Sequence, residues 1–297
     1  MTLIASIPSP SSGVVDLGPI SIHMYGLMLL AAIAAAIGLT GLRWRRLGGD
    51  WDLVLRVAVW GVAFGIVGAR LYHVITSWSE VPDDWWGPFA VWEGGLGVWG
   101  GILFGVAAGW VVVRRAGEST ALFADAVAPG LLVAQGIGRI GNWFNQELFG
   151  KPTDLPWALE IDAEHRPEQY FDDATFHPTF LYELVYDLAL AGVLVLVGWR
   201  FRIKAPALFA LYVSVYTFGR FFEELLRVDP AHELGPLRLN AWVSIACFAV
   251  STAFFVWWQF LRGEGEGPRR ALGLGRRKKK QQGKRPPTMT VPRGRVR

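Results

Sequence analysis

The sequence predicts an all-α integral membrane protein with about seven transmembrane helices, its N-terminus outside and its C-terminus in the cytoplasm. Three observations predict this class. The 297 residues are 52% hydrophobic and only 18% charged, whereas a soluble domain usually carries about 25% charged residues. The mean hydropathy is +0.32. Apolar stretches of roughly 20 residues, enough to cross a bilayer core of about 30 Å as a helix, recur along the chain.

Seven apolar segments qualify as spans. In chain order they cover residues 20–42, 53–78, 95–113, 121–140, 179–199, 206–226 and 240–261. The third segment carries a glycine at every fourth position, at Gly97, Gly101, Gly105 and Gly109. This spacing puts the glycines on one side of a helix, where they favour close packing against a neighbouring helix over direct lipid binding.

The connections between the spans predict the orientation, because basic residues stay on the cytoplasmic side. The basic residues of the first, third and fifth connections are Arg43, Arg45, Arg46, Arg114, Arg115, Arg200, Arg202 and Lys204. The second connection is acidic, with Glu80, Asp83 and Asp84, and acids outnumber bases at about 146–177. We therefore expect residues 1–262 to form one seven-span membrane domain with an extracytoplasmic segment at about 146–177.

Residues 263–297 are expected to be a disordered cytoplasmic tail. From Arg262 onward the chain holds thirteen Lys and Arg residues and two acids, so the part before it has seven more acids than bases. The tail lacks apolar periodicity, which is typical of disorder. We expect it to touch anionic lipid, with each basic residue near the surface contributing roughly 1 kcal/mol. We do not expect a nucleic-acid partner.

Ionisable and polar side chains gather in the outer halves of the expected spans. An Arg at a helix centre costs roughly 2.5–3.5 kcal/mol on insertion scales, so such groups usually face a protein or water-filled interior. Those in the outer half of a span or at the outer surface are His23, Tyr25, Arg70, Arg139, Asn142, His177, Glu183, Arg220 and Glu224. The same spans also hold His73, Tyr182, Tyr216, Glu223 and Arg227. Asp125 alone falls near the inner face. We expect one polar site that opens toward the extracytoplasmic side.

Arg139 stands among glycines at the end of the fourth span. Gly138 and Gly141 allow close backbone approach to a ligand, and Asn142 and Asn145 add neutral donors and acceptors. The planar guanidinium of Arg139 suits a phosphate. The alternative interpretation is a helix end whose Arg reaches the interface.

The sixth span supplies a second arginine. Arg220 and Glu224 are four residues apart, as are Glu223 and Arg227, so each pair can meet on one helix face. Two arginines from different helices, Arg139 and Arg220, can also clamp one phosphodiester. That arrangement fits an anionic lipid headgroup and stabilises a departing phosphate.

These segments resemble a known family. Gly138-Arg139-Ile140-Gly141-Asn142, followed by Asn145, Glu147, Gly150 and Lys151-Pro152-Thr153-Asp154-Leu155-Pro156-Trp157, is similar to the signature of the bacterial prolipoprotein diacylglyceryl transferases. The resemblance extends to His23-Met24-Tyr25-Gly26, Gly68-Ala69-Arg70, Trp92-Glu93-Gly94-Gly95 and His177-Pro178-Thr179-Phe180-Leu181-Tyr182-Glu183. The sixth span matches the family's Gly/Ala-x-Arg-x-x-x-Glu-x-x-Arg pattern. Coverage is roughly residues 15 to 262, and the tail lies outside it.

The resemblance implies a reaction. Such an enzyme moves the diacylglyceryl group of phosphatidylglycerol to the thiol of the lipobox cysteine in a prolipoprotein, forming a thioether and releasing glycerol phosphate. It implies a multi-pass protein of the bacterial cytoplasmic (inner) membrane with the active site toward the extracytoplasmic side. It also implies that neither a cofactor nor a metal is needed.

The resemblance also implies roles for individual residues. Arg139 and Arg220 would hold the phosphate, and Glu224 would orient Arg220. Tyr25 and Tyr216 would line the reaction cavity. The remaining substrate-binding residues would be Asn142, Glu147, Gly150, Arg70 and His177.

One position departs from the family pattern. Many members carry a histidine in the third span, where this chain has Trp99, and an indole cannot take a proton from a thiol. His23 is the nearest alternative base, although His23 and His177 fit structural hydrogen bonds equally well.

Two other function classes stay open. A polytopic transporter, or a lipid-binding protein without catalysis, would have polar groups on a path between the two faces. An intramembrane hydrolase would need a Ser/His or Asp/Asp pair at membrane depth, and the sequence has no Gly-x-Ser-x-Gly run. The single cysteine, Cys247, excludes a disulfide framework.

Overall fold

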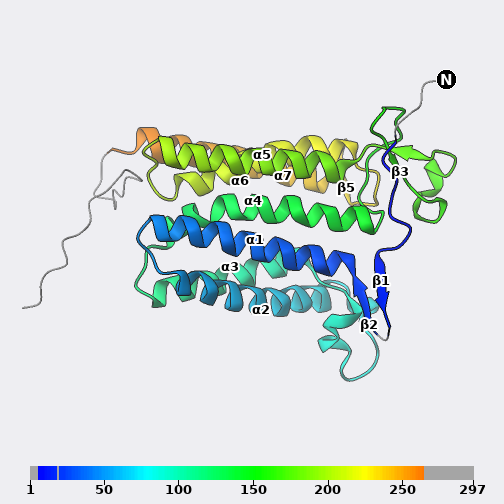
Figure 1. The fold of residues 1–297 in the computed structure, drawn as a ribbon, viewed down its shortest axis with the longest axis horizontal. Coiled ribbons are helices and arrows are strands. Elements are labelled where there is room, and N and C mark those ends of the chain that lie inside the picture. The colour runs from blue at the N-terminus through cyan, green and yellow to red at the C-terminus, as the bar shows by residue number, and fades with distance from the viewer. Residues whose placement is uncertain (1–5, 19, 264–297) are drawn as a thin grey trace, which may run out of the picture.

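A computed structural model describes residues 6–18 and 20–263, and within them seven long helices run side by side (Figure 1). The helices are α1 (Met24–Arg46), α2 (Trp51–Thr76), α3 (Val98–Arg115), α4 (Thr120–Phe144), α5 (Thr179–Arg200), α6 (Ala207–Leu226) and α7 (Leu239–Val256). A π-helical segment, Trp257–Leu261, continues α7. Each of the seven expected spans is confirmed as a helix. The basic tail lies outside the described residues.

Short elements gather at one end of the bundle (Figure 1). Three antiparallel strand pairs lie there: β1 (Val14–Leu17) with β2 (Ile20–His23), β3 (Leu159–Glu160) with β4 (Thr175–Phe176), and β5 (Glu233–Leu234) with β6 (Leu237–Arg238). Short 3-10 turns cover Trp78–Glu80, Gly87–Phe89, Val91–Glu93, Ala163–His165 and Glu168–Tyr170.

The expectation that the first span begins at residue 20 is wrong. Residues 20–23 form strand β2, and α1 begins only at Met24. The Ile-Ser-Ile-His sequence alternates apolar and polar residues, as strands do. Ser21 lies opposite Asp16 in the pair and donates a hydrogen bond to its carboxylate at 2.6 Å.

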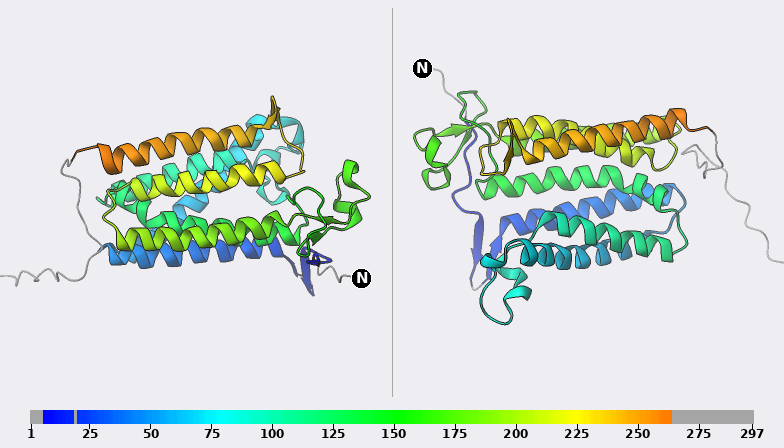
Figure 2. Two further views of the ribbon diagram at one scale, coloured as in Figure 1. Left: turned by 90° about the horizontal axis from the view of Figure 1, so that it is seen from above. Right: turned by 180° about the vertical axis from the view of Figure 1, so that it is seen from behind.

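Six of the seven helices are long and apolar enough to cross a membrane by length and composition. The exception is α6, whose last two turns carry Arg220, Glu223 and Glu224. It packs against α4, α5 and α7, so these charges sit within the bundle (Figure 2). The chain is therefore a polytopic all-α membrane protein.

The glycines of α3 pack against α2, as their spacing predicts. A Cβ atom added at Gly105 would lie 3.0 Å from the carbonyl oxygen of Gly61, and one added at Gly101 would lie 3.5 Å from that of Gly65. A Cβ atom would be crowded at Gly105 and in ordinary van der Waals contact at Gly101, so the two helix backbones approach closely. The glycine stripe is a helix-packing surface.

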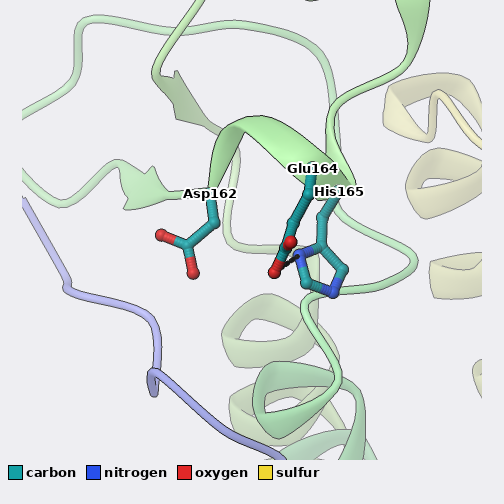
Figure 3. Close-up of side chains that lie close together, drawn as sticks. All are labelled: Asp162, Glu164 and His165. Carbon is teal, nitrogen blue, oxygen red and sulfur yellow. Dashed lines mark ion pairs between the residues drawn. The ribbon is translucent and has the colours of Figure 1, made fainter.

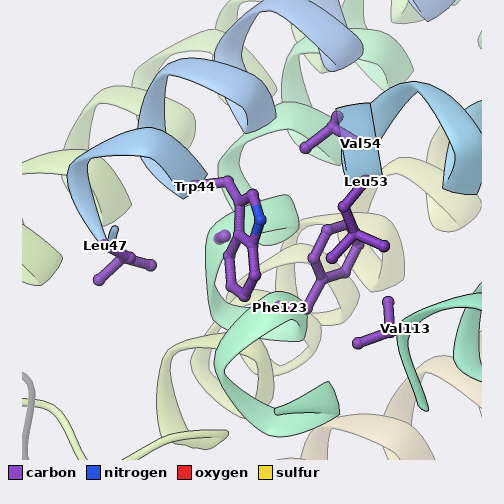
Figure 4. Packing of buried hydrophobic residues seen from close by; sticks show 7 residues of the cluster. Trp44, Leu47, Leu53, Val54, Val113 and Phe123 are labelled. Atoms are coloured by element: carbon purple, nitrogen blue, oxygen red, sulfur yellow. The ribbon is translucent and has the colours of Figure 1, made fainter. Parts of the chain in front are cut away.

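At the end of the bundle away from the strands, the helices are joined by an aromatic contact and by buried polar contacts. The rings of Trp44 and Phe123 meet edge to face, with centroids 5.1 Å apart (Figure 4). Nearby, the Asp125 carboxylate accepts the backbone N–H of Phe209 at 2.8 Å. Arg43 donates to two carbonyl oxygens of α4, at 3.1 and 3.2 Å. Asp125 thus holds the start of α6 and does not line a path across the membrane.

The directions of the helices bring the expected site residues to one end of the bundle. Helices α1, α5 and α7 begin at the strand end, and α4 and α6 finish there. Residues in the first turns of α1 and α5 therefore reach the same level as residues in the last turns of α4 and α6.

Candidate active site

Glu183 joins the two arginines. It lies near the start of α5 and is only 5% exposed. Arg139 of α4 donates from Nη2 to Oε1 at 2.7 Å, and its Nε forms an ion pair with Oε2, also at 2.7 Å. Arg220 of α6 places Nη1 3.4 Å from Oε2, and the Tyr216 hydroxyl donates to Oε1 at 3.3 Å. Arg139 and Arg220 thus converge from different helices on one buried carboxylate.

Arg139 keeps donors free for an anion. A guanidinium has five N–H groups. Glu183 accepts one from Nη2 and pairs with Nε, and the side-chain oxygen of Asn142 accepts one from Nη1 at 3.3 Å. Within the described part of the chain, one N–H on each terminal nitrogen is left without a partner. Two N–H groups of one guanidinium can bind oxygens of a phosphate.

A polar chain leads from Arg139 to the surface. Asn142 donates from Nδ2 to Oε1 of Glu147 at 2.7 Å, and Asn145 donates to the same oxygen at 3.3 Å. Glu147 and Asn145 line a cavity of about 360 Å³ together with residues 10–14 and His165. The structure therefore brings the expected residues Asn142 and Glu147 together beside Arg139.

Arg220 is held by carboxylates of its own helix. Its Nη1 lies 2.7 Å from Oε2 of Glu223, and its Nη2 lies 2.8 Å from Oε2 of Glu224. The Arg220–Glu224 pair expected from spacing is confirmed. The other oxygen of Glu224 is 3.1 Å from Nε of Arg238.

The expected pair between Glu223 and Arg227 is wrong. Helix α6 ends at Leu226, and Arg227 is extended, with φ −64° and ψ 147°, so it leaves the helix face. It contacts Asp229 instead, at 2.7 and 2.8 Å, and Arg238 reaches the same carboxylate at 2.8 Å. Burial would raise the pKa of Asp229, but the two arginines hold it below its ordinary value.

Tyr25 packs flat against α4 where Gly141 leaves space. A Cβ atom added at Gly141 would lie 2.6 Å from Cδ2 of the Tyr25 ring. Tyr25 lies close enough to Arg139 and Glu147 to interact with both electrostatically. Gly141 therefore sets the position of Tyr25 beside the arginine.

Arg70 binds a loop. Its guanidinium donates to the carbonyl oxygens of Gly87, Pro88, Gly94 and Gly95 at 2.5 to 3.2 Å. These contacts fold the connection between α2 and α3. No hydrogen bond or ion pair among the described residues links Arg70 to Arg139 or Arg220.

The expected histidines lie at the rim. Nδ1 of His177 is 3.1 Å from the Tyr182 hydroxyl, and burial lowers the pKa of His177. Gly150 donates its N–H to the His177 carbonyl at 3.0 Å, and a Cβ there would lie 2.8 Å from Cβ of His177. His23 is exposed at the end of β2, and Trp99 is 54% exposed in the first turn of α3.

Sequence reasoning gave no role to two buried acids on α5. Glu183 counted only as one of many polar residues, because its partners lie 37 and 44 positions away. Asp187, one turn deeper, is 0% exposed, and neither of its oxygens has a hydrogen-bond partner in the described structure. The signal available in the sequence was the spacing of two acids at i and i+4 in an apolar segment.

A second cluster of ionisable side chains lies in the segment between α4 and α5. Oxygen and nitrogen atoms of Asp162, Glu164 and His165 lie within 4.8 Å of one another (Figure 3). All three residues are exposed, and Asp162 already accepts from the Gln146 side chain at 2.6 Å. Exposed acids of this kind are common, and we assign no ion to them.

Comparison with known proteins gives a consistent family. The family model described as prolipoprotein diacylglyceryl transferase matches residues 12–257. The chain is 50% identical over 260 residues to a protein of Frankia alni called phosphatidylglycerol–prolipoprotein diacylglyceryl transferase, covering 85% of this chain and 67% of that one. It is 48% identical over 264 residues to a protein of the same name from Cutibacterium acnes, covering 88% and 89%. The chain therefore belongs to the prolipoprotein diacylglyceryl transferase family.

Proposed function

We propose that this chain transfers the diacylglyceryl group of phosphatidylglycerol to the thiol of the lipobox cysteine in prolipoproteins and releases glycerol phosphate. The observation that carries the proposal is the convergence of Arg139 and Arg220 on Glu183, with two N–H groups of Arg139 left free. The names of the relatives support both substrates.

The chemistry is a displacement at a glyceryl carbon. The sulfur forms a bond to that carbon, and the carbon–oxygen bond to phosphate breaks with its electron pair staying on the phosphate. Negative charge grows on the phosphate as it leaves, so fixed guanidinium donors stabilise the transition state more than the ground state. Arg139 supplies these donors, and Asn142 and Glu147 orient the glycerol end of the headgroup. Tyr25 and Tyr216 line the cavity around the reacting carbon.

The proposed location follows from charge. Connections at the end opposite the strands are basic, so that end would face the cytoplasm. The strand end and the site beside it would then face the extracytoplasmic side of the bacterial inner membrane. A lipobox cysteine that emerges from the membrane on that side would reach Arg139 together with a phosphatidylglycerol of the outer leaflet.

The function has a direct test. Purified full-length protein is incubated with phosphatidylglycerol labelled in its glycerol headgroup and with a lipobox peptide. The proposal expects a peptide heavier by one diacylglyceryl group and an equal amount of labelled glycerol phosphate. A folded protein that yields neither product would overturn it.

Gly141→Ala should lower kcat by about a hundredfold, since misplacing a reacting group by about 1 Å costs this much. The new Cβ would lie 2.6 Å from the Tyr25 ring and force it away from Arg139. Gly138→Ala is the matched control, because no atom lies within 4 Å of its added Cβ. Similar rates for the two variants would show that the Tyr25 position is unimportant.

Removing the residues after Gly263 should leave transfer within about twofold of the full chain, because the residues proposed to act all lie before it. Binding to vesicles rich in anionic lipid should weaken, since the removed residues carry ten more bases than acids while the whole chain has a net charge of only +4. Cosedimentation with such vesicles at two salt concentrations measures the second effect. A folded truncation without transferase turnover would contradict the first.

A further inference from the structure

Two buried carboxyl groups, those of Glu183 on α5 and Glu223 on α6, meet at one nitrogen of Arg220. Arg220 Nη1 touches both, at 3.4 Å from Oε2 of Glu183 and 2.7 Å from Oε2 of Glu223. The side chains are 4% and 8% exposed. Nothing in the proposed reaction has yet used this contact.

Two carboxylates that share one site repel each other, so such a pair holds one proton between its two carboxyl groups. A carboxylate beside a carboxylic acid is the composition of an acid–base couple. The other ionisable groups that face it are Arg139 of α4, Tyr216, Arg220 and, deeper on α5, Asp187.

The proposed transfer needs such a couple. A cysteine attacks as thiolate, so its proton must be taken up. The phosphate that leaves gains negative charge and accepts a proton readily. Among the described residues, none of the five histidines hydrogen-bonds or ion-pairs with Arg139 or Arg220. The carboxyl pair is in contact with both arginines.

We propose that Glu183 and Glu223 are the acid–base pair of this transfer, an inference that rests on the proposed function. The ionised carboxylate takes the thiol proton as the carbon–sulfur bond forms. The carbon–oxygen bond breaks, its electrons stay on the phosphate oxygen, and the second carboxyl group gives its proton to that oxygen. One proton enters the pair and one leaves, so the pair ends with its original charge.

Glu224 provides the matched control. It touches Arg220 as closely as Glu223 does, at 2.8 Å against 2.7 Å. It contacts Nη2 of Arg220, not the Nη1 that Glu183 and Glu223 share, and its other oxygen is 3.1 Å from Nε of Arg238. Replacing either residue with glutamine removes one carboxyl group beside Arg220, but only Glu223→Gln removes it from the pair.

The test compares two acceptors with the full-length protein. One is a lipobox peptide, and the other is the same peptide with selenocysteine at the acceptor position, whose selenol ionises near neutral pH without help. With the cysteine peptide, Glu223→Gln should lower kcat/KM by about a hundredfold or more, the usual worth of general acid–base catalysis. With the selenocysteine peptide the loss should shrink at least about tenfold. Glu224→Gln should lose the same factor with both acceptors.

The outcomes separate the two proposals. If the intact protein converts neither acceptor, the proposed function fails. If it is active but Glu223→Gln loses the same factor with both acceptors, or Glu224→Gln is rescued equally well, the acid–base assignment is wrong. Thermal unfolding in detergent shows that the variants are folded. Glu223→Asp, which keeps a carboxyl group, should retain more activity than Glu223→Gln with the cysteine peptide, and the reverse order would also overturn the assignment.

Discussion

Replacing Arg139 with alanine is expected to lower kcat/KM for transfer by about a hundredfold to a thousandfold, the usual effect of removing one preorganised donor to a developing anion. Arg139 has two N–H groups without a partner among the described residues, and Glu183 fixes its Nε and Nη2 side. Arg139→Lys should recover little, because an ammonium cannot hold Glu183 and a phosphate with the same planar fork.

The control for this variant is Arg56→Ala. Arg56 is exposed and pairs only with Asp52 across one helical turn, so it should keep the rate of the parent protein. Initial rates at several concentrations of phosphatidylglycerol measure both variants. A near-normal rate for folded Arg139→Ala would remove this residue from the phosphate-binding role.

Replacing Arg220 with methionine is expected to abolish transfer and to lower the free energy of unfolding by about 3–5 kcal/mol. Removing one partner of a buried ion pair usually has an effect of this size on stability. Arg220 contacts three buried carboxyl groups, those of Glu183, Glu223 and Glu224, at 2.7 to 3.4 Å. Without it, three acids in the interior of the bundle share too little positive charge.

Unfolding in detergent followed by circular dichroism measures this effect. Arg56→Met is again the comparison, and its exposed pair should change stability by less than about 1 kcal/mol. Equal unfolding transitions for Arg220→Met and Arg56→Met would show that the carboxylates do not depend on Arg220.

The sequence predicted the seven helices because each is an apolar stretch with charged residues near its ends, and a hydropathy profile identifies such stretches. It failed at residues 20–23, where a strand of alternating apolar and polar residues runs into α1 with no loop between them. It also failed at Arg227, since spacing alone does not tell where α6 ends. Helix ends depend on local hydrogen bonds that the apolar pattern does not encode.

Within the candidate site, spacing found only the contacts made inside one helix. The Arg220–Glu224 pair follows from an interval of four residues. The contact of Arg139 with Glu183 joins α4 to α5, and the two residues are 44 positions apart. Residue spacing within one helix cannot predict such a contact. Nor does the sequence predict the contacts of Arg70, which donates to carbonyl oxygens of the loop between α2 and α3.

The most direct test of the transfer uses phosphatidylglycerol with oxygen-18 at the bridge between the diacylglyceryl carbon and the phosphorus. Purified full-length protein is incubated with this lipid and a lipobox peptide, and the masses of both products are measured by mass spectrometry. Displacement at carbon, with the phosphate held by Arg139, predicts an unlabelled diacylglyceryl peptide and glycerol phosphate that carries the heavy oxygen. Absence of the lipidated peptide, or heavy oxygen found in the peptide product, would contradict this account.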